Sequence, residues 1–402
     1  MRITESMMSQ QLLYNLNQIQ EGIATSQNEM ATGKLLNKPS DNPLAVSQVM
    51  ADSTSISQAQ SYLSNIQSGS TWMSSTSTVL QSMTSTLQSI RNIALQALNT
   101  PSQTANATTG LQQEVAQLIN NVYQLTDTQQ GNSYLFGGFA SETQVSTYIA
   151  PSQLTTNATA ASTTAPVVTT GGTVSIIGSL GSAQVTIPNN ATLQQIQTAI
   201  NGVQSQTGVT ASLPAGGAGV QLVLQPQQPG TAFGMSGNQV TLTGGSALSV
   251  SSVQTNTPPA GYTGSIQYAV SSSTKEQVNV TADSVFNQTP PKATQGLANT
   301  LQSILNDIGN PSGLQQDLGN LSANISQMIQ INTEVGARQN QMQTMQTQTN
   351  QFITNLKNQQ GTLQNANMAQ VLTQYNSDMT TFQAALQMGA KVLLPTLAQY
   401  LP

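Results

Sequence analysis

Fourteen acidic and nine basic side chains are what this sequence offers for acid–base or metal chemistry, because it contains no cysteine and no histidine. Without those two residue types there can be no Ser-His-Asp triad, no cysteine nucleophile and no HExxH zinc site. Carboxylates alone could still bind a hard cation or act as a hydrolytic pair. The acidic residues are scattered over 402 positions and form no cluster of the D-x-D-x-D type. The sequence therefore argues against an enzyme and indicates no cofactor and no metal.

The low charge content narrows the possible partners. Charged residues make up 6% of the chain, against about a quarter in typical proteins. Nucleic-acid binding needs clustered basic charge, and a net charge of −5 disfavours anionic membrane surfaces. No run of 18 apolar residues predicts a membrane-spanning helix, and the N-terminus lacks the apolar core of a cleavable secretion signal. Composition alone therefore predicts a cytoplasmic protein that binds neither nucleic acid nor membrane.

Apolar residues recur with heptad spacing near both ends of the chain. The N-terminal seam is Leu12, Leu16, Ile19, Ile23 and Met30; the C-terminal seams are Met342, Met345, Phe352, Leu356 and Leu363, then Met368, Leu372, Tyr375, Met379, Phe382, Leu386 and Leu393. The change of frame after Leu363 indicates a stutter. Similar seams run over residues 73–97 and 111–125. Packing in an ordinary bundle would explain any single helix. Chain ends usually fray, however, so apolar seams at both ends favour pairing with each other and with neighbouring subunits.

Turn signals separate the first two predicted helices. Gly33 suits a helix C-terminus, Asp41 or Asn42 suits a helix N-cap, and Pro43 suits the first helical turn. Taken by itself, the segment 33–43 is most simply an interhelical loop.

The middle of the chain differs in kind, because residues 143–274 contain no Asp, Glu, Lys or Arg. Alternating apolar residues predict strands over 173–177, 183–187, 209–213, 220–224, 239–243, 247–253, 264–271 and 277–282. Leu193, Ile196, Ile200 and Val203 predict a helix capped by Thr192. Helices are predicted over 44–99, 104–130 and 297–363. The fold class is therefore mainly α with an inserted β-rich domain. The expected segments are 1–36, 37–142, 143–260, 261–363 and 364–402, and deletion of 145–258 is expected to leave assembly intact.

Three motifs resemble the flagellin family. They are GKLLNKPSDNP at 33–43, NSYLFGG at 132–138 and EVGARQN at 334–340, which resemble the family's N-terminal signature, the close of its third helix and the opening of its C-terminal helix. Residues 172–225 resemble a small repeat found within flagellins and filament-cap proteins. The resemblance implies a long helical coiled-coil rod with an outer β/α domain. It also implies a non-enzymatic structural subunit of the bacterial flagellum, secreted by type III export. The tail GAKVLLPTL at 389–397 resembles the hook–filament junction branch; filament flagellin is the alternative.

The resemblance also implies a set of contacts. The expected assembly interface comprises Ile3, Met7, Leu12, Leu16, Ile19, Ile23, Met379, Phe382, Leu386, Leu393 and Leu397. The family-motif loop comprises Asn37, Lys38, Pro39, Ser40, Asp41 and Pro43, and the C-terminal helix motif comprises Gly336, Ala337, Arg338 and Asn340. The implied partners are further copies of the chain, the hook-side associated protein, flagellin, and an export chaperone on the C-terminal helix around 368–401. An adhesin using the β domain is a further alternative, although few aromatic residues there could form a sugar platform.

Overall fold

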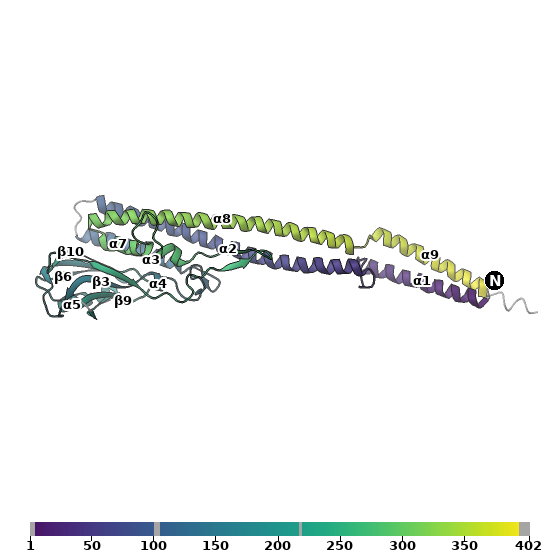
Figure 1. The fold of residues 1–402 in the computed structure, drawn as a ribbon, viewed down its shortest axis with the longest axis horizontal. Coiled ribbons are helices and arrows are strands. Elements are labelled where there is room, and N and C mark those ends of the chain that lie inside the picture. The colour runs from purple at the N-terminus through teal and green to yellow at the C-terminus, as the bar shows by residue number, and fades with distance from the viewer. Residues whose placement is uncertain (1–4, 100–104, 217–218, 394–402) are drawn as a thin grey trace, which may run out of the picture. The chain divides into compact units, whose positions relative to one another are not determined.

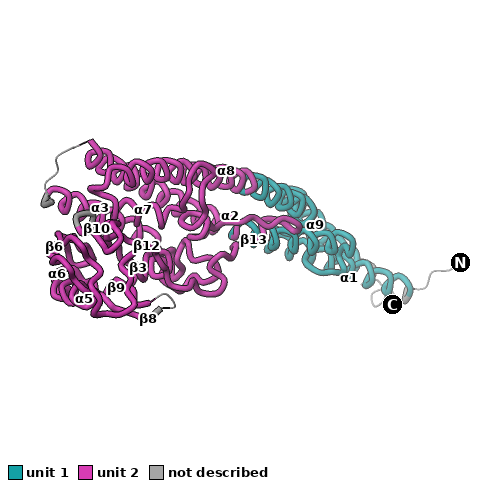
Figure 2. The backbone as a smooth tube through the Cα atoms, turned by 60° about the vertical axis from the view of Figure 1, so that its left-hand side comes forward, with its two compact units in different colours: residues 1–64, 346–402 teal, residues 65–345 magenta. Residues whose placement is uncertain are grey.

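The computed structural model describes residues 5–99, 105–216 and 219–393. Two compact units divide the chain (Figure 2). Unit 1 comprises residues 1–64 and 346–402, and unit 2 comprises residues 65–345. The long helices α2 (Pro43–Asn99) and α8 (Pro311–Gln364) each contribute residues to both units. The fold is mainly α with an inserted β-rich region, as the sequence predicts.

Unit 1 is helical throughout its regular elements. Helix α1 (Glu5–Thr32) and helix α9 (Met368–Leu393) lie side by side (Figure 1). Helix α1 stops where expected, because Gly33 takes a positive φ of 68° that a side chain would disfavour. Asn42 caps α2, since its Oδ1 atom accepts the backbone N–H of Ala45 at 3.1 Å. The predicted stutter is a full break between Gln364 and Met368.

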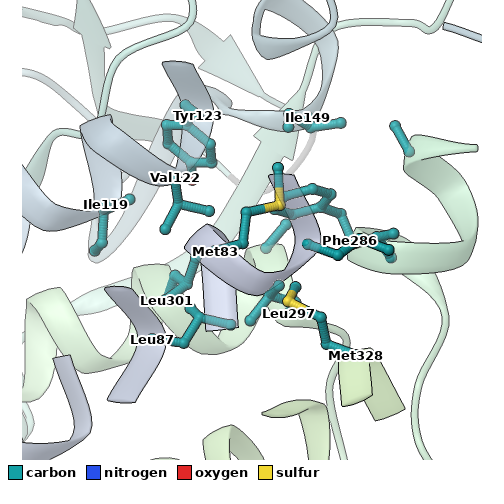
Figure 3. Close-up of a cluster of buried hydrophobic side chains, with 14 of the residues drawn as sticks. Met83, Leu87, Ile119, Val122, Tyr123, Ile149, Phe286, Leu297, Leu301 and Met328 are labelled. Atoms are coloured by element: carbon teal, nitrogen blue, oxygen red, sulfur yellow. The ribbon is translucent and has the colours of Figure 1, made fainter. Parts of the chain in front are cut away.

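Unit 2 is built around the apolar stripe of α2. Leu80, Met83, Leu87 and Ile90 are fully buried, and they pack with α3 (Ala105–Thr126) and α7 (Leu297–Asp307). Figure 3 shows Met83 and Leu87 beside Leu297 and Leu301 of α7. The heptad-like seams at 73–97 and 111–125 are therefore largely intramolecular core, which is the ordinary packing interpretation of such a pattern.

Two predicted helices are shorter than the sequence indicated. The helix expected over 104–130 ends at Thr126, and a hairpin of β1 (Gln129–Gln130) and β2 (Ser133–Tyr134) follows. Gly131, with φ of 63°, makes that turn possible. The single helix expected over 297–363 is also wrong. It breaks after Asp307 and restarts at Pro311, because a residue before proline avoids helical geometry and Gly309 adopts φ of 100°.

The inserted region contains two five-stranded sheets and a helix. One sheet has the order β11-β10-β5-β6 with β4 paired to β10; the other has β12-β3-β9-β7 with β8 paired to β9. The strands are β3 (Pro151–Ala160), β4 (Val168–Thr170), β5 (Gly172–Gly178), β6 (Gly181–Ile187), β7 (Val209–Ser212), β8 (Ala215–Gly216), β9 (Gly219–Pro226), β10 (Gly234–Leu242), β11 (Ala247–Leu248) and β12 (Val250–Thr255). Helix α5 (Leu193–Asn201) begins with the predicted cap, in which Thr192 and Gln195 form a capping box.

Some elements of this region were not predicted. Strands β3 and β4 are rich in Thr and lack clear apolar alternation, so they carry no period-two signal. The strand expected over 277–282 is instead β14 (Lys275–Gln277), paired with β13 (Gln267–Ala269). The short helices α4 (Ser146–Ile149) and α6 (Gln204–Thr207) and a π-helix over Asp283–Asn287 complete the elements of the described chain.

The insertion is anchored in the core of unit 2. Tyr148 and Ile149 are buried among the helical core residues, and the ring of Tyr148 meets that of Tyr262 edge-on at 5.7 Å. Burial, with Asp127 and Tyr262 nearby, raises the pKa of Tyr148 to about 12. The first and last strands pair at their outer ends, Pro151 opposite Thr255. The chain therefore leaves and re-enters the helical part at neighbouring points.

Candidate assembly interface

Two glycines lie where helices α1 and α9 contact each other. A Cβ atom placed on Gly389 would lie 2.7 Å from Cδ2 of Leu12, and one placed on Gly22 would lie 3.2 Å from Oδ2 of Asp378. Residue numbers that rise on α1 fall on α9, so the two helices are antiparallel. Small residues allow such close packing because the backbones can approach without a side chain between them. The faces of α1 and α9 that do not contact each other are the remaining surface of this helix pair.

The predicted interface residues divide into two groups by exposure. Leu12, Leu16, Ile19, Ile23, Met379 and Phe382 are half-buried within unit 1, whereas Met7 is 59% exposed and Leu386 is 48% exposed. Ile3 and Leu397, and the side chain of Leu393, lie outside the described residues. The half-buried group therefore stabilises the unit as well as offering part of its surface, and the exposed group is free for other contacts.

Exposed apolar side chains are concentrated in unit 1. Among the described residues, twelve of the fifteen large exposed hydrophobic side chains belong to this unit: Met7, Met8, Leu13, Tyr14, Leu35, Leu44, Met50, Phe352, Met368, Leu372, Leu386 and Met388. In the same described part of the unit, the buried hydrophobic side chains are Ile56, Ala59, Ile353 and Val371. Several of the twelve, such as Leu13 and Tyr14, sit beside the heptad seam, so the seam pattern alone did not select them.

The family-motif loop is ordered by hydrogen bonds within unit 1. The Asp41 carboxylate accepts the backbone N–H groups of Asn37 at 3.0 Å and Lys38 at 2.8 Å. The start of the loop pairs with the link between α8 and α9, where Leu35 N–H donates to the Gln364 carbonyl at 2.7 Å. Pro39, Ser40 and Pro43 are exposed. The loop and the end of α1 line a cleft of about 420 Å³ that includes Glu29, Leu35 and Lys38. Asp41 thus shapes the loop, and Asn42 caps the helix that follows.

The C-terminal helix motif lies in the middle of a helix rather than at its opening. Helix α8 starts at Pro311, well before Glu334, because the preceding residues continue the helical apolar pattern. Gly336 has no neighbouring atom within 4 Å of a built Cβ, and Ala337 and Asn340 are exposed. Arg338 is ion-paired with Glu334 one turn earlier. The motif therefore presents a small, weakly charged surface in unit 2. Similarly, NSYLFGG follows the third helix as β2 and a loop.

Two further findings concern the described residues. No group of three or more acidic residues gathers in them to hold a metal ion. No helix in the described ranges combines the length and apolar character that crossing a bilayer requires.

Comparisons with known proteins agree with the motifs. Residues 3–141 match the model of the bacterial flagellin N-terminal helical region. The chain carries flagellin segments. Residues 168–225 match a second one, the flagellin hook IN motif, and this match covers β5, β6, α5, β7 and β9. The resemblance read from residues 33–43 and 172–225 is thereby confirmed.

Solved structures with similar folds include three flagellar proteins. One, from Vibrio parahaemolyticus, is described as a flagellar hook-associated protein; it is 14% identical, with 81% of this chain and 99% of that chain covered and a TM-score of 0.48. Flagellar hook associated protein-3 of Legionella pneumophila is 15% identical over 78% and 98% of the two chains, with a TM-score of 0.39. The flagellar junction protein FlgL of the same organism is 15% identical over 79% and 100%, with a TM-score of 0.37. No curated protein matches the sequence. The assignment to flagellin-type segments therefore rests on the matches at 3–141 and 168–225.

Proposed function

We propose that this chain is a structural, non-enzymatic subunit of the bacterial flagellum at the hook–filament junction. The observation that carries the proposal is the imbalance in unit 1, whose described helices expose twelve large apolar side chains and bury four hydrophobic ones. The match to the flagellin N-terminal helical region includes α1, α2 and α3 and so supports the same assignment. A helical hairpin with so little core gains stability only by covering its apolar surface with other protein.

The energy available from association can be estimated from exposure. Burying a Leu- or Met-sized side chain completely is worth about 1.5–3 kcal/mol. Leu13, Leu372 and Leu386 are 61%, 51% and 48% exposed, so each retains about half of that gain for assembly. Twelve such side chains hold about 9–18 kcal/mol per subunit before the entropy of ordering the helices is subtracted. This apolar surface is the source of free energy that the proposal assigns to association.

In the proposed mechanism, α1 and α9 cover their outer surfaces against the same helices of neighbouring copies. The contacts use the exposed residues Met7 and Leu386 together with outward parts of Leu16, Ile23 and Phe382. The loop 37–43 contacts a neighbouring subunit or the hook-side associated protein, and Arg338 lies on a second contact surface. The distal neighbours are flagellin subunits, and an export chaperone covers α9 before secretion by the type III route. The insertion faces outward.

The choice between junction and filament rests on the tail GAKVLLPTL at 389–397, which resembles the junction branch. Labelling intact flagella distinguishes the two. An epitope inserted in the exposed turn at Gly244–Gly245, where neither glycine has a close neighbour, would leave the sheets paired. A single band of immunogold label at the base of the filament supports the junction assignment. Label along the whole filament would instead make the chain filament flagellin, and absence from purified flagella would overturn both.

A further inference from the structure

Two carboxyl groups meet at the turn between α7 and α8. Asp307 is the last residue of α7, and Asp317 lies in the second turn of α8 with 4% of its surface exposed. Asp307 lies on the same face of α8 as Asp317, because a Cβ placed on Gly313, one helical turn before Asp317, would collide with Oδ2 of Asp307. The Oδ2 atom of Asp317 is buried and has no hydrogen-bond partner among the described residues. Two carboxylates can share a hydrogen bond only if one of them keeps a proton, because both oxygens otherwise only accept.

The surroundings assign that proton to Asp317. Asp307 lies against the first turn of α8, where a Cβ on Gly313 would collide with its Oδ2 atom, and Asn310 Nδ2 donates to its Oδ1 at 3.3 Å. A helix N-terminus and an amide donor both favour a negative charge on Asp307. Oδ2 of Asp317 has no donor among the described residues, so the proton belongs to Asp317, which donates to ionised Asp307.

No ion pair joins a basic side chain to Asp307 or Asp317 among the described residues. The elements around the pair carry few other ionisable groups: α7 has none, α3 has Glu114 and Tyr123, α2 has Asp52, Tyr62 and Arg91, the segment before α7 has Lys292, and α8 has Glu334, Arg338 and Lys357. Arg91 is engaged elsewhere, because its Nε donates to Ser322 of α8 at 3.3 Å. Among the described residues, the ion pair found is that of Arg338 with Glu334. Burial first, then the charge of Asp307 and the hydrogen bond to it, raise the pKa of Asp317 to about 7.

We propose that Asp307 and Asp317 form a proton-operated latch that closes the α7–α8 turn in acid and loosens it as the pH rises through neutrality. The turn depends on short hydrogen bonds, from Asn310 N–H to the Asp307 carbonyl at 2.8 Å and from Leu314 N–H to the Asn310 carbonyl at 3.0 Å. Gln112 of α3 ties the same end of α7 through the carbonyls of Leu305 and Ile308. Loss of the proton places two like charges at this junction and separates the helices there.

The sign of the effect follows from proton linkage. Between the ordinary aspartate pKa and a pKa of about 7, folded Asp317 keeps a proton that the unfolded chain has released. The stabilisation is therefore complete below the ordinary pKa and is lost as the pH rises to about 7. In that window the equilibrium constant for unfolding unit 2 increases about tenfold per pH unit. The sequence has no histidine, so no other side-chain type ordinarily titrates between pH 5 and 8.

Urea unfolding of the full chain at intervals from pH 5 to 8.5, in the presence of EDTA, tests the latch. The wild-type chain is expected to lose stability from pH 5 to about 7 and then level off. Asp317→Asn keeps the shape and removes the proton, so its stability should stay flat and exceed that of the wild type at pH 8. Glu142→Gln, a change at an exposed carboxylate in the same unit, is the matched control and should keep the wild-type slope. A wild-type profile that is flat over this range, or an unchanged slope in Asp317→Asn, would overturn the proposal.

A direct titration covers the case in which Asp317→Asn fails to fold. The chain has seven aspartates, so carbon-13 labelling of their carboxyl groups gives a short set of signals. One signal is expected to titrate near pH 7 in the wild type and to shift to lower pH in Asp307→Asn. If every aspartate titrates below pH 5, the latch does not exist. If millimolar Ca²⁺ stabilises the wild type at pH 8 but not Asp307→Asn, the pair is a cation site and the latch is refuted.

Discussion

Replacing three exposed leucines of unit 1 with glutamine is expected to weaken assembly and to leave the folding of the free chain almost unchanged. Leu13, Leu372 and Leu386 each retain about half of their surface for contacts with other subunits. Losing about 1 kcal/mol at each position removes about 3 kcal/mol from association. Because 1.4 kcal/mol corresponds to a factor of ten, the critical concentration for polymerisation should rise about 150-fold. Cells carrying the triple variant should therefore lose filaments and swimming, even at normal expression of the chain.

The fold of the free chain should barely respond to the same changes. Side chains this exposed contribute little to stability, and surface substitutions usually change the free energy of unfolding by less than about 0.5 kcal/mol. Circular dichroism and urea unfolding check this directly. In contrast, Leu87→Ala empties part of the core of unit 2 and should cost about 2–5 kcal/mol. The comparison shows whether a defect arises from folding or from assembly.

Ile329→Gln supplies the matched control for assembly. Ile329 is 49% exposed, like Leu386, but lies in unit 2. Sedimentation of polymers from a dilution series measures the critical concentration of each variant. The reasoning is refuted if the triple variant polymerises at the wild-type concentration while remaining folded, or if Ile329→Gln raises that concentration as much as the triple variant does.

Three further predictions concern other parts of the chain. Gly138→Ala should lower the free energy of unfolding by about 2 kcal/mol or more in urea titrations, because φ is +58° and the new Cβ would collide with the Tyr262 carbonyl oxygen. Gly336→Ala, in open helical surface, should leave the free energy of unfolding unchanged. Joining Pro151 directly to Thr255 should remove both five-stranded sheets and preserve assembly. Deleting 145–258 should instead destabilise unit 2, because it removes core residues such as Tyr148. Pelleting measures assembly of the two deletion variants, and thermal melts measure their stability. In the free chain, amides of α1 and α9 should exchange with solvent far faster than those of residues 79–94, and equal protection would contradict assembly-dependent order.

Much of the local structure could be predicted from the residues themselves. Gly33, Asn42 and Pro43 end one helix and start the next, because left-handed glycine, an N-cap side chain and proline's fixed φ act within a few residues. The Thr192 capping box is equally local. The motifs at 33–43 and 132–138 and the repeat at 172–225 also sufficed to indicate the flagellin segments. What the sequence left open was the use of each seam, since residues 73–97 and residues 12–30 carry the same heptad spacing.

Tertiary structure decided which apolar residues are covered. Leu80 and Leu87 are buried because α3 and α7 reach them, whereas Leu13 and Leu386 remain exposed because α1 and α9 have little except each other within unit 1. The pairing of Asp307 with Asp317 likewise required the break at Gly309, which places the end of one helix against the start of the next. The sequence by itself determined the turn between α1 and α2, the cap of α5 and the absence of charge in the insertion, because these depend on neighbours along the chain. Burial and proton sharing depend on neighbours in space, and only the fold supplies those.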